Sequence, residues 1–233
     1  MEIFIINLLK NMKQFYLFVI FLLSSIIFIQ IQCQTLTLTR TQLAAWIPDY
    51  AIASSIDLSF NRDITSIDTS AFSGLVNLAS LYLDGNRLVQ IDSFTFKDLS
   101  NLKTLWLDYN QIGFINVNAF SQLNNLVGLY MSHNLLGSVS LLDTALFNSL
   151  RSLQILDMSD NKLTRIDPLQ FNQLSKLKVL NLSQNNLVAI DRLSLVGLVN
   201  LESVFLLNNP ISSTQQSYVL QLCSTNPKCK IYV

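Results

Sequence analysis

An asparagine recurs along this chain at an almost constant interval, and this periodicity restricts the possible folds more than any other feature of the sequence. The asparagines are Asn61, Asn86, Asn110, Asn134, Asn161, Asn185 and Asn209, at intervals of 25, 24, 24, 27, 24 and 24 residues. Aliphatic residues precede each asparagine by three and by five positions, and a leucine precedes all but the first by eight. Seven copies in one register indicate a chain built from repeated structural units.

Each unit reads L-x-x-L-x-L-x-x-N, and the pattern has a physical cause. The aliphatic residues of L-x-L alternate with an exposed residue, which is the pattern of a strand with one buried face. The asparagine amide has both donors and acceptors, so it can bond backbone groups of adjacent turns that would otherwise be buried without partners. One unit cannot bury its leucines alone. We therefore predict a solenoid with a parallel sheet and an asparagine ladder formed by the seven asparagines.

The second half of each unit is also regular. A second core position holds Phe72, Phe96, Phe120, Phe147, Phe171 and Leu195. It is preceded in most units by a helix N-cap residue, namely Asp68, Asp92, Asn116, Asp167 and Asp191. We predict short helical or 3-10 turns over a phenylalanine spine on the convex side. The fourth unit is three residues longer, and we place this insertion near residues 140–143.

The repeat, including its extension N-x-L-x-x-I-x-x-x-x-F-x-x-L, resembles the typical extracellular leucine-rich repeats of Slit-, Toll- and decorin-like proteins. The resemblance implies an α/β leucine-rich-repeat solenoid, a horseshoe with a parallel concave sheet. The sequence departs from that family at its ends. It has no N-terminal cysteine cluster, and Asn209-Pro210 is not followed by the tryptophan and close cysteine pair of the usual C-terminal cap.

The N-terminus reads as a targeting segment. Lys10 and Lys13 precede the apolar run 15–31, which is the pattern of a signal peptide and also reaches the lower length limit of a membrane-spanning anchor. We predict a signal peptide or signal anchor over 1–33, an N-terminal cap over 34–52, seven repeats over 53–211 and a C-terminal cap over 212–233. Either reading of the first segment places the repeats outside the cell, secreted or membrane-anchored.

Two covalent modifications follow from that compartment. Cys223 and Cys229, six residues apart near the C-terminus, are expected to form a disulfide; two free thiols are the alternative. Asn181-Leu182-Ser183 is a glycosylation sequon, which would restrict a protein ligand to the first four or five repeats if Asn181 carries a glycan. Many sequons stay empty, so occupied and empty states are both open.

The exposed residues of the L-x-L strands point to a binding surface. In repeat order they are Asp57, Tyr82, Trp106, Tyr130, Asp157, Asn181 and Phe205. Three aromatic residues on adjacent strands, with Asp84 and Asp108 beside them, have the composition of a protein-binding hot spot. We predict a protein-binding site at Tyr82, Asp84, Trp106, Asp108, Tyr130 and Asp157.

The alternative is that these aromatic side chains merely stack on one another across strands. We expect Trp106→Ala to abolish binding while changing stability by only about 1 kcal/mol, as at an exposed position. Phe205 and Leu207 make the last repeat strand apolar. We expect the tail after Ser212 to cover it, with a dimer contact as the alternative.

Composition argues against other functions. The formal net charge is +0, so no basic footprint suggests nucleic acid. His133 is the only histidine, and no metal-ligand spacing, phosphate loop or dinucleotide motif occurs. A calcium or acid/base pair at Asp84 and Asp108 is the remaining chemical alternative. We expect no enzyme activity, no cofactor and no metal.

The sequence thus predicts an extracellular protein-binding module that uses the concave face of the solenoid, as a soluble receptor, co-receptor or innate-type recognition protein. The alternative is a structural or matrix protein that self-associates or binds through its end surfaces. The membrane is a partner only if the N-terminal segment is an uncleaved anchor.

Overall fold

The computed structural model describes residues 35–61, 63–137, 142–220, 226 and 228–233. The chain divides into two compact units, Met1–Thr35 and Leu36–Val233. The expected signal or anchor segment, residues 1–33, lies outside the described residues. The second unit contains all of the described helices and strands.

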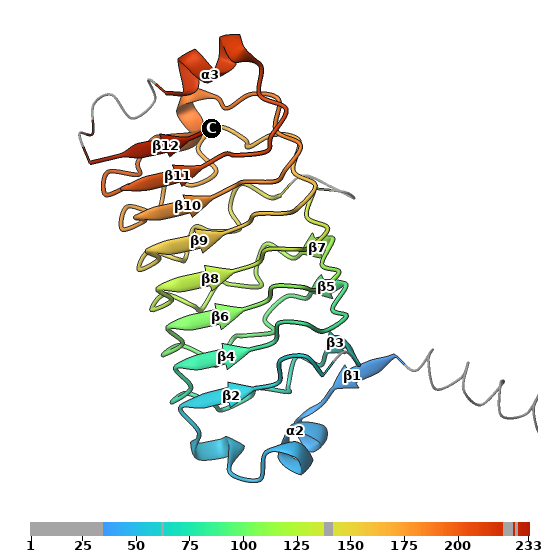
Figure 1. Cartoon of the computed structure of the whole chain (residues 1–233). Helices are drawn as coiled ribbons and strands as arrows, with labels where there is room; N and C mark the ends of the chain where they lie inside the picture. Colours follow the sequence, from blue (N-terminus) through green and yellow to red (C-terminus); the bar gives the residue numbers. More distant parts are fainter. Residues whose placement is uncertain (1–34, 62, 138–141, 221–225, 227) are drawn as a thin grey trace, which may run out of the picture. The chain divides into compact units, whose positions relative to one another are not determined.

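An eight-stranded parallel sheet extends through the second unit (Figure 1), in the order β12, β11, β10, β9, β8, β6, β4, β2. The strands are β2 (Ser55–Asp57), β4 (Ser80–Tyr82), β6 (Thr104–Trp106), β8 (Gly128–Tyr130), β9 (Ile155–Asp157), β10 (Val179–Asn181), β11 (Ser203–Phe205) and β12 (Lys230–Tyr232). Each of the seven repeats supplies one strand, and the C-terminal tail supplies β12. This arrangement confirms the predicted parallel solenoid.

The strands are short because each contains only the L-x-L part of a repeat. In β2 to β11 the central residue of each strand is buried, and the residue after it, at the C-terminal end of the strand, is half-buried or exposed. In β12 the central residue, Ile231, is half-buried. Leu81, Leu105 and Leu129 are in register on β4, β6 and β8 and are fully buried. Burying one such side chain contributes about 1.5–3 kcal/mol, and a single repeat has no partner against which to bury it. Stacking of the repeats therefore builds the core.

Short strands also form on the opposite side of the coils (Figure 1): β1 (Leu36–Leu38), β3 (Ile64–Ile67), β5 (Gln90–Ile91) and β7 (Phe114–Ile115). β1 pairs with β3, and β5 pairs with β7, both in parallel. The phenylalanine spine is confirmed, since all five phenylalanines are at most 1% exposed. Neighbouring rings are 6.1 Å apart for Phe72–Phe96 and 6.3 Å for Phe96–Phe120.

The predicted turns of the convex side are confirmed as single hydrogen-bonded turns of the 3-10 type, as between the N–H of Ala71 and the carbonyl oxygen of Asp68 and between the N–H of Ala119 and the carbonyl oxygen of Asn116, both at 2.9 Å. Within the described residues of 53–211, η2 (Arg192–Leu195) is the one stretch in which such turns continue as a 3-10 helix. The residues expected to be N-caps also form hydrogen bonds at these turns through their side chains. Asp68 accepts a hydrogen bond from the backbone N–H of Ser70 at 2.8 Å, and Asn116 accepts one from Asn118 at 3.0 Å. This side-chain bond completes a tight turn without requiring a helix.

The fourth repeat keeps the same turn despite its insertion. Asp143 accepts a hydrogen bond from the backbone N–H of Ala145 at 2.8 Å and lies four residues before Phe147, as Asp68 lies four before Phe72. Asp143 is therefore the turn residue of this repeat, so the extra residues precede it. Of residues 140–143, where the insertion is expected, 140 and 141 lie outside the described residues.

The asparagine ladder is confirmed from Asn86 to Asn209. In a representative rung, the Asn110 amide donates to the carbonyl oxygens of Leu83 (3.0 Å) and Leu107 (3.1 Å), and it accepts from the backbone N–H of Leu88 (3.0 Å). Each amide thus joins two consecutive repeats. Asn61 stands at the N-terminal end, where no earlier repeat strand offers a carbonyl. Oδ1 of Asn86, which faces that end, is buried without a hydrogen-bond partner among the described residues.

The ends of the solenoid are covered by non-repeat segments. Helix α2 (Arg40–Trp46) begins with a capping box between Thr39 and Gln42, and η1 (Tyr50–Ile52) leads into β2. Helix α3 (Ser213–Val219) follows the last repeat, and β12 then pairs with β11. The Phe205 ring stacks on Tyr232 at 4.7 Å, so the tail covers this side chain as expected. Leu207 stays 46% exposed.

Candidate functional site

The parallel register places three aromatic side chains side by side on the sheet face, by which we mean the side chains of the eight-stranded sheet that point away from the leucine core. Tyr82, Trp106 and Tyr130 are in register on β4, β6 and β8. The ring centroids are 4.1 Å apart for Tyr82–Trp106 and 5.4 Å for Trp106–Tyr130, and both pairs deviate by only 8° from parallel planes. These three stacked rings form the aromatic column.

The three aromatic side chains therefore do stack on one another across strands, as the alternative to a binding site predicts. It does not remove the column from contact with a ligand, because all three residues remain half-buried rather than buried. Trp106 differs from the sequence expectation in one respect. It is held between two rings, so its replacement affects two stacked pairs and is not a simple surface change.

Gly128 was not expected to contribute to the site. A Cβ atom at this position would lie 3.0 Å from Cε2 and 3.2 Å from the hydroxyl oxygen of Tyr130. The Tyr130 side chain therefore lies back along its own strand over Gly128. The corresponding positions on β4 and β6 are Ser80 and Thr104, whose hydroxyl groups are hydrogen-bonded at 3.0 Å. The sequence signal was a glycine inside a strand, which marks a close approach.

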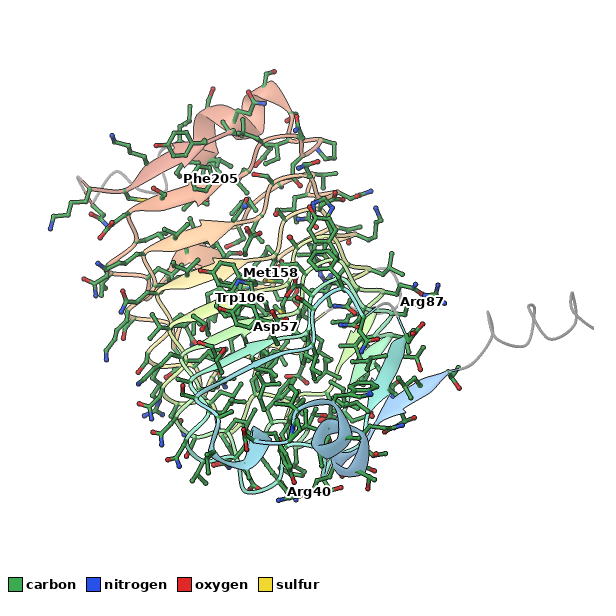
Figure 2. The ribbon with its side chains drawn as sticks, turned by 60° about the horizontal axis from the view of Figure 1, so that its bottom comes forward. Arg40, Asp57, Arg87, Trp106, Met158 and Phe205 are labelled. Atoms are coloured by element: carbon green, nitrogen blue, oxygen red, sulfur yellow. The ribbon has the colours of Figure 1, made fainter. Side chains whose placement is uncertain are left out.

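Two aspartates stand at the ends of the aromatic column. Asp57 on β2 is in register with Tyr82, and Asp157 on β9 is in register with Tyr130. Each accepts two hydrogen bonds at Oδ1 from the serine two residues later, Ser59 and Ser159, at 2.9 Å from the backbone N–H and 2.6 Å from the hydroxyl. Asp57 and Trp106 lie on β2 and β6, which are separated by β4, and Figure 2 labels Arg40 and Arg87 away from both.

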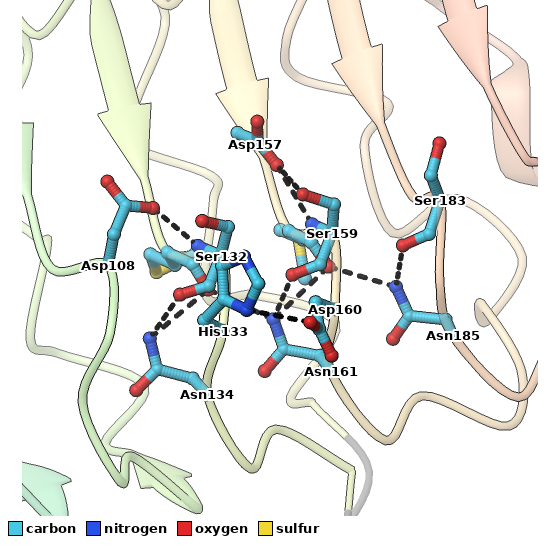
Figure 3. A network of polar contacts seen from close by, with 12 residues as sticks. Asp108, Ser132, His133, Asn134, Asp157, Ser159, Asp160, Asn161, Ser183 and Asn185 are labelled. Carbon is cyan, nitrogen blue, oxygen red and sulfur yellow. Dashed lines mark hydrogen bonds and ion pairs between the residues drawn. The ribbon is translucent and has the colours of Figure 1, made fainter.

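Asp84 and Asp108 lie two residues after Tyr82 and Trp106, just beyond the ends of β4 and β6. Asp108 accepts a hydrogen bond from the backbone N–H of Ser132 at 2.6 Å (Figure 3). Oδ1 of Asp84 is buried without a hydrogen-bond partner among the described residues. Burial raises the pKa of both carboxyls above the usual value. The neighbouring charge of Asp57 adds to the effect at Asp84, and the charges of Asp157 and Asp84 add to it at Asp108.

Two further groups on this face, Asp57 and Tyr130, have shifted pKa values. Hydrogen bonds from Ser59 lower the pKa of Asp57, which is exposed. Burial, followed by the charges of Asp108 and Asp157, raises the pKa of the Tyr130 phenol. The sheet face is therefore electrostatically negative around the aromatic column.

Basic side chains are missing from this part of the surface. Across the described strands β2 to β11, the outward positions within each strand and directly after it carry Asp57, Asp84, Asp108 and Asp157 but neither lysine nor arginine. Among the described strands of the sheet, the one basic outward residue is Lys230 on β12, at the end of the sheet opposite β2. The six predicted site residues are thus brought together on β4 to β9.

His133 has partners that the sequence did not reveal. Its Nδ1 lies 2.7 Å from Oδ2 of Asp160 in the next repeat (Figure 3), and its ring stacks on Tyr109 at 4.1 Å. His133, Asp160 and Tyr109 all precede a ladder asparagine and all have positive φ. They form a row along the edge of the sheet rather than part of the aromatic column.

The predicted modification sites lie apart from the aromatic column. The Asn181 amide donates to Oδ2 of Asp157 at 3.0 Å and accepts from the backbone N–H of Ser183 at 3.2 Å. Cys229 is half-buried and packs against the core, whereas Cys223 lies outside the described residues.

The described residues lack two structural features. They contain no group of three or more His, Cys, Asp or Glu side chains that could hold a metal ion. Nor do they include a helix with the length and apolar character needed to cross a membrane.

A parallel sheet of one strand per repeat, a leucine core and an asparagine ladder together define the class of leucine-rich-repeat solenoids. Two segments of the sequence, residues 76–136 and 151–211, match the family described as "Leucine rich repeat", and together they make up just over half of the chain. The chain belongs to the leucine-rich-repeat family. No curated protein matches its sequence.

Solved structures of the same class are similar to this chain. Toll from the Drosophila Toll–Spatzle complex is 28% identical with a TM-score of 0.64, over 75% of this chain and 24% of Toll. TLR13 from its complex with ssRNA13 is 28% identical with a TM-score of 0.66, over 77% of this chain and 28% of TLR13. The leucine-rich-repeat domain of APL1B is 25% identical with a TM-score of 0.60, over 76% of this chain and 51% of that one. This chain therefore spans only about a quarter to a half of these structures.

Proposed function

We propose that this protein is an extracellular recognition module that binds a protein ligand on its sheet face and catalyses no reaction. The observation that carries the proposal is the aromatic column, three half-exposed rings on adjacent strands. Stacked rings are rigid, so a ligand can bury them with little loss of side-chain entropy. Aromatic side chains among polar neighbours are enriched in binding hot spots.

The surrounding acids define the rest of the proposed site. Asp84, Asp108 and Asp157 lie on the same face and can accept hydrogen bonds from a ligand. The Toll structure, which is similar to this chain, was solved in complex with Spatzle. TLR13 was solved in complex with ssRNA13. For this chain we propose a protein rather than a nucleic acid, because the described sheet face repels phosphate.

The proposal includes the compartment and the processing of the chain. Residues 1–33 act as a signal peptide or anchor, 34–52 and 212–233 as caps, and 53–211 as the recognition surface. A disulfide between Cys223 and Cys229 closes the C-terminal cap; the structure has Cys229 in the disulfide-bonded state, which supports this pairing. Glycosylation of Asn181 stays a prediction, and a glycan there would replace its hydrogen bond to Asp157. Mass loss after treatment with a glycan-removing amidase tests it.

A pull-down from the extracellular fluid in which the protein occurs tests the binding site. The wild-type chain is compared with Trp106→Ala and with the control Phe114→Ala, which removes a 44% exposed aromatic side chain from β7 on the opposite side of the coils. We expect a ligand that wild type and the control retain and that Trp106→Ala loses. Equal recovery by all three chains would show that the aromatic column is not the binding site.

A structural protein that self-associates is the second candidate. The observation in its favour is the exposed apolar C-terminal end, where Leu207 is 46% and Tyr232 is 40% exposed. Gel filtration at two concentrations separates the candidates. Self-association predicts earlier elution at the higher concentration and loss of that shift in Leu207→Ser, whereas a recognition module predicts the same elution volume at both concentrations.

A further inference from the structure

Among the described residues, no other ring stacks on the face of the aromatic column at its β2 end. The inner face of Tyr82 is covered by Trp106 at 4.1 Å. On the outer side, the in-register residue is Asp57, whose side chain is much shorter than a ring. The sheet face therefore has a step there, with the Tyr82 ring as its wall and the Asp57 carboxylate at its foot.

The far side of the step is hollow. Asp57 lines a depression together with Trp46, Ile47, Ser59 and Asn61, at the N-terminal end of the sheet. The Trp46 side chain is 41% exposed. The Asp57 carboxylate is thus flanked by Tyr82 on one side and by a depression with a second aromatic residue on the other. A ligand side chain has room to reach the carboxylate from solvent.

One oxygen of the Asp57 carboxylate is also available to accept a hydrogen bond from a ligand. Both of its hydrogen bonds, from the backbone N–H and the hydroxyl of Ser59, go to Oδ1. Among the described residues, no hydrogen bond is made to Oδ2. At the other end of the column, Asp157 accepts at Oδ1 from Ser159 and at Oδ2 from Asn181. The two ends are therefore not equivalent, and the β2 end is the one prepared for a donor.

We propose that the protein ligand inserts an arginine side chain into this step, with its guanidinium stacked on the outer face of Tyr82 and hydrogen-bonded to Asp57. The inference rests on the proposed function and names the chemistry of its partner. A guanidinium is planar, so it can stack on a ring and donate to a carboxylate at the same time, which an ammonium does less well.

Charge complementarity selects a basic partner for the rest of the face as well. Asp84 lies beside the step, its buried Oδ1 has no hydrogen-bond partner among the described residues, and Asp57 and Asp84 repel one another. A bound cation relieves this repulsion. The described strands β2 to β11 carry no basic side chain on this face that could do so from within the protein. An anionic partner such as a nucleic acid would add to the repulsion.

Titration with short peptides tests the arginine step on the mature chain. The probes are a tetra-arginine peptide, a tetra-lysine peptide and a tetra-citrulline peptide, which keeps the shape of arginine without its charge. We expect the arginine peptide to bind more tightly than the lysine peptide, the citrulline peptide not to bind, and binding to weaken as salt is raised. Binding by citrulline equal to that by arginine, or equal affinity for arginine and lysine, would overturn the proposal.

Matched variants locate the binding. Asp57→Asn keeps the Oδ1 acceptor for Ser59 and removes the charge, so the local turn is preserved. Asp63→Asn removes the same charge from an exposed position off this face. We expect Asp57→Asn to weaken arginine-peptide binding by about fivefold, the upper range for an exposed ion pair, and Asp63→Asn to leave it unchanged. Equal effects of the two variants would overturn the proposal.

The same variants separate this inference from the proposed function. If the natural ligand in the pull-down is lost by Trp106→Ala but retained by Asp57→Asn, the sheet face binds a protein and the arginine step is wrong. If Trp106→Ala retains the ligand, the proposed function itself fails. Loss of the ligand with both variants supports both. If wild type retained a single-stranded RNA and Trp106→Ala lost it, the proposal of a basic partner would be overturned.

Discussion

Tyr82 and Trp106 stack across neighbouring strands with ring centroids 4.1 Å apart and planes within 8° of parallel, and Tyr130 continues the stack on the far side of Trp106. The register of the sheet enforces this relationship, since the three residues occupy the same position in consecutive repeats. The aromatic column is therefore part of the solenoid as well as a candidate contact surface. Stability and binding have to be separated when it is mutated.

Trp106→Ala is expected to lower the free energy of unfolding by about 1–3 kcal/mol, because each of two stacked pairs contributes about 0.5–1.5 kcal/mol. This exceeds the effect of about 1 kcal/mol expected for an exposed position. Trp106→Phe, which keeps a ring between its neighbours, should lose less than half as much. Urea denaturation of the three chains measures the difference. Equal losses in both variants would mean that stacking adds little to stability.

The asparagine ladder predicts that replacing a buried asparagine lowers the free energy of unfolding more than replacing one at the end of the ladder. The Asn134 amide donates to Leu107 and accepts from the backbone N–H of Ile112, both at 2.9 Å, and it is buried. Asn134→Ala leaves several buried backbone groups unpaired, at about 1–3 kcal/mol each. We expect a loss of at least about 3 kcal/mol in the free energy of unfolding.

The matched control for the ladder is Asn209→Ala, at the half-buried C-terminal rung. Water reaches this site more easily and can replace part of the lost bonds. Its loss should be about half that of Asn134→Ala, measured by the same denaturation. A larger loss at Asn209 than at Asn134 would contradict the view that the ladder acts through burial.

Much of this fold could be predicted because the same pattern of buried and exposed residues occurs in all seven repeats. The positions of Leu81, Leu105 and Leu129 identify the buried face of each strand without any knowledge of tertiary structure. The phenylalanine spine follows in the same way. On the convex side the predicted turns are present, but how many continue as a helix was not predictable, because a capping residue such as Asp68 or Asn116 signals a helix and a side-chain turn equally.

The candidate site was predictable in composition but not in detail. Repeat position was enough to place Tyr82, Trp106 and Tyr130 on adjacent strands. It could not reveal the partnership of His133 with Asp160, which depends on the conformation of the residue before each ladder asparagine. Likewise, Asp57 and Asp157 occupy equivalent positions in sequence, and their hydrogen-bond partners alone distinguish them.

Close packing of consecutive coils predicts that Gly197→Ala strongly lowers the stability of the chain. This residue has a φ of +89°, and a Cβ atom there would lie 2.6 Å from the backbone oxygen of Asn172 in the preceding repeat. Gly74 has a φ of +76° but no atom within 4 Å of the corresponding position. Gly74→Ala should therefore cost about 1–2 kcal/mol from backbone conformation alone. Gly197→Ala should cost clearly more, as measured by thermal unfolding, and equal costs would rule out the contact between coils.

Asp84 predicts an unusual dependence of stability on pH. Burial raises its pKa above 3.8, so the folded chain keeps this proton to a higher pH than the unfolded chain does. The contribution of Asp84 to the free energy of unfolding therefore falls as the pH rises from about 3.8 through the folded-state pKa, and is constant above it. In Asp84→Asn the side chain cannot ionise, so this fall in the free energy of unfolding does not occur.

We expect the Asp84→Asn chain to be more stable than wild type at pH 7 by less than about 1 kcal/mol, because the carboxyl is partly exposed and solvent screens its charge. The advantage should disappear below the usual aspartate pKa, where both chains are uncharged at this position. Urea denaturation between pH 3 and pH 7 measures the difference, with Asp63→Asn as the control for a change in total charge. If the gain in stability is the same at pH 3 and pH 7, it arises from hydrogen bonds of the new asparagine side chain rather than from removal of the buried charge.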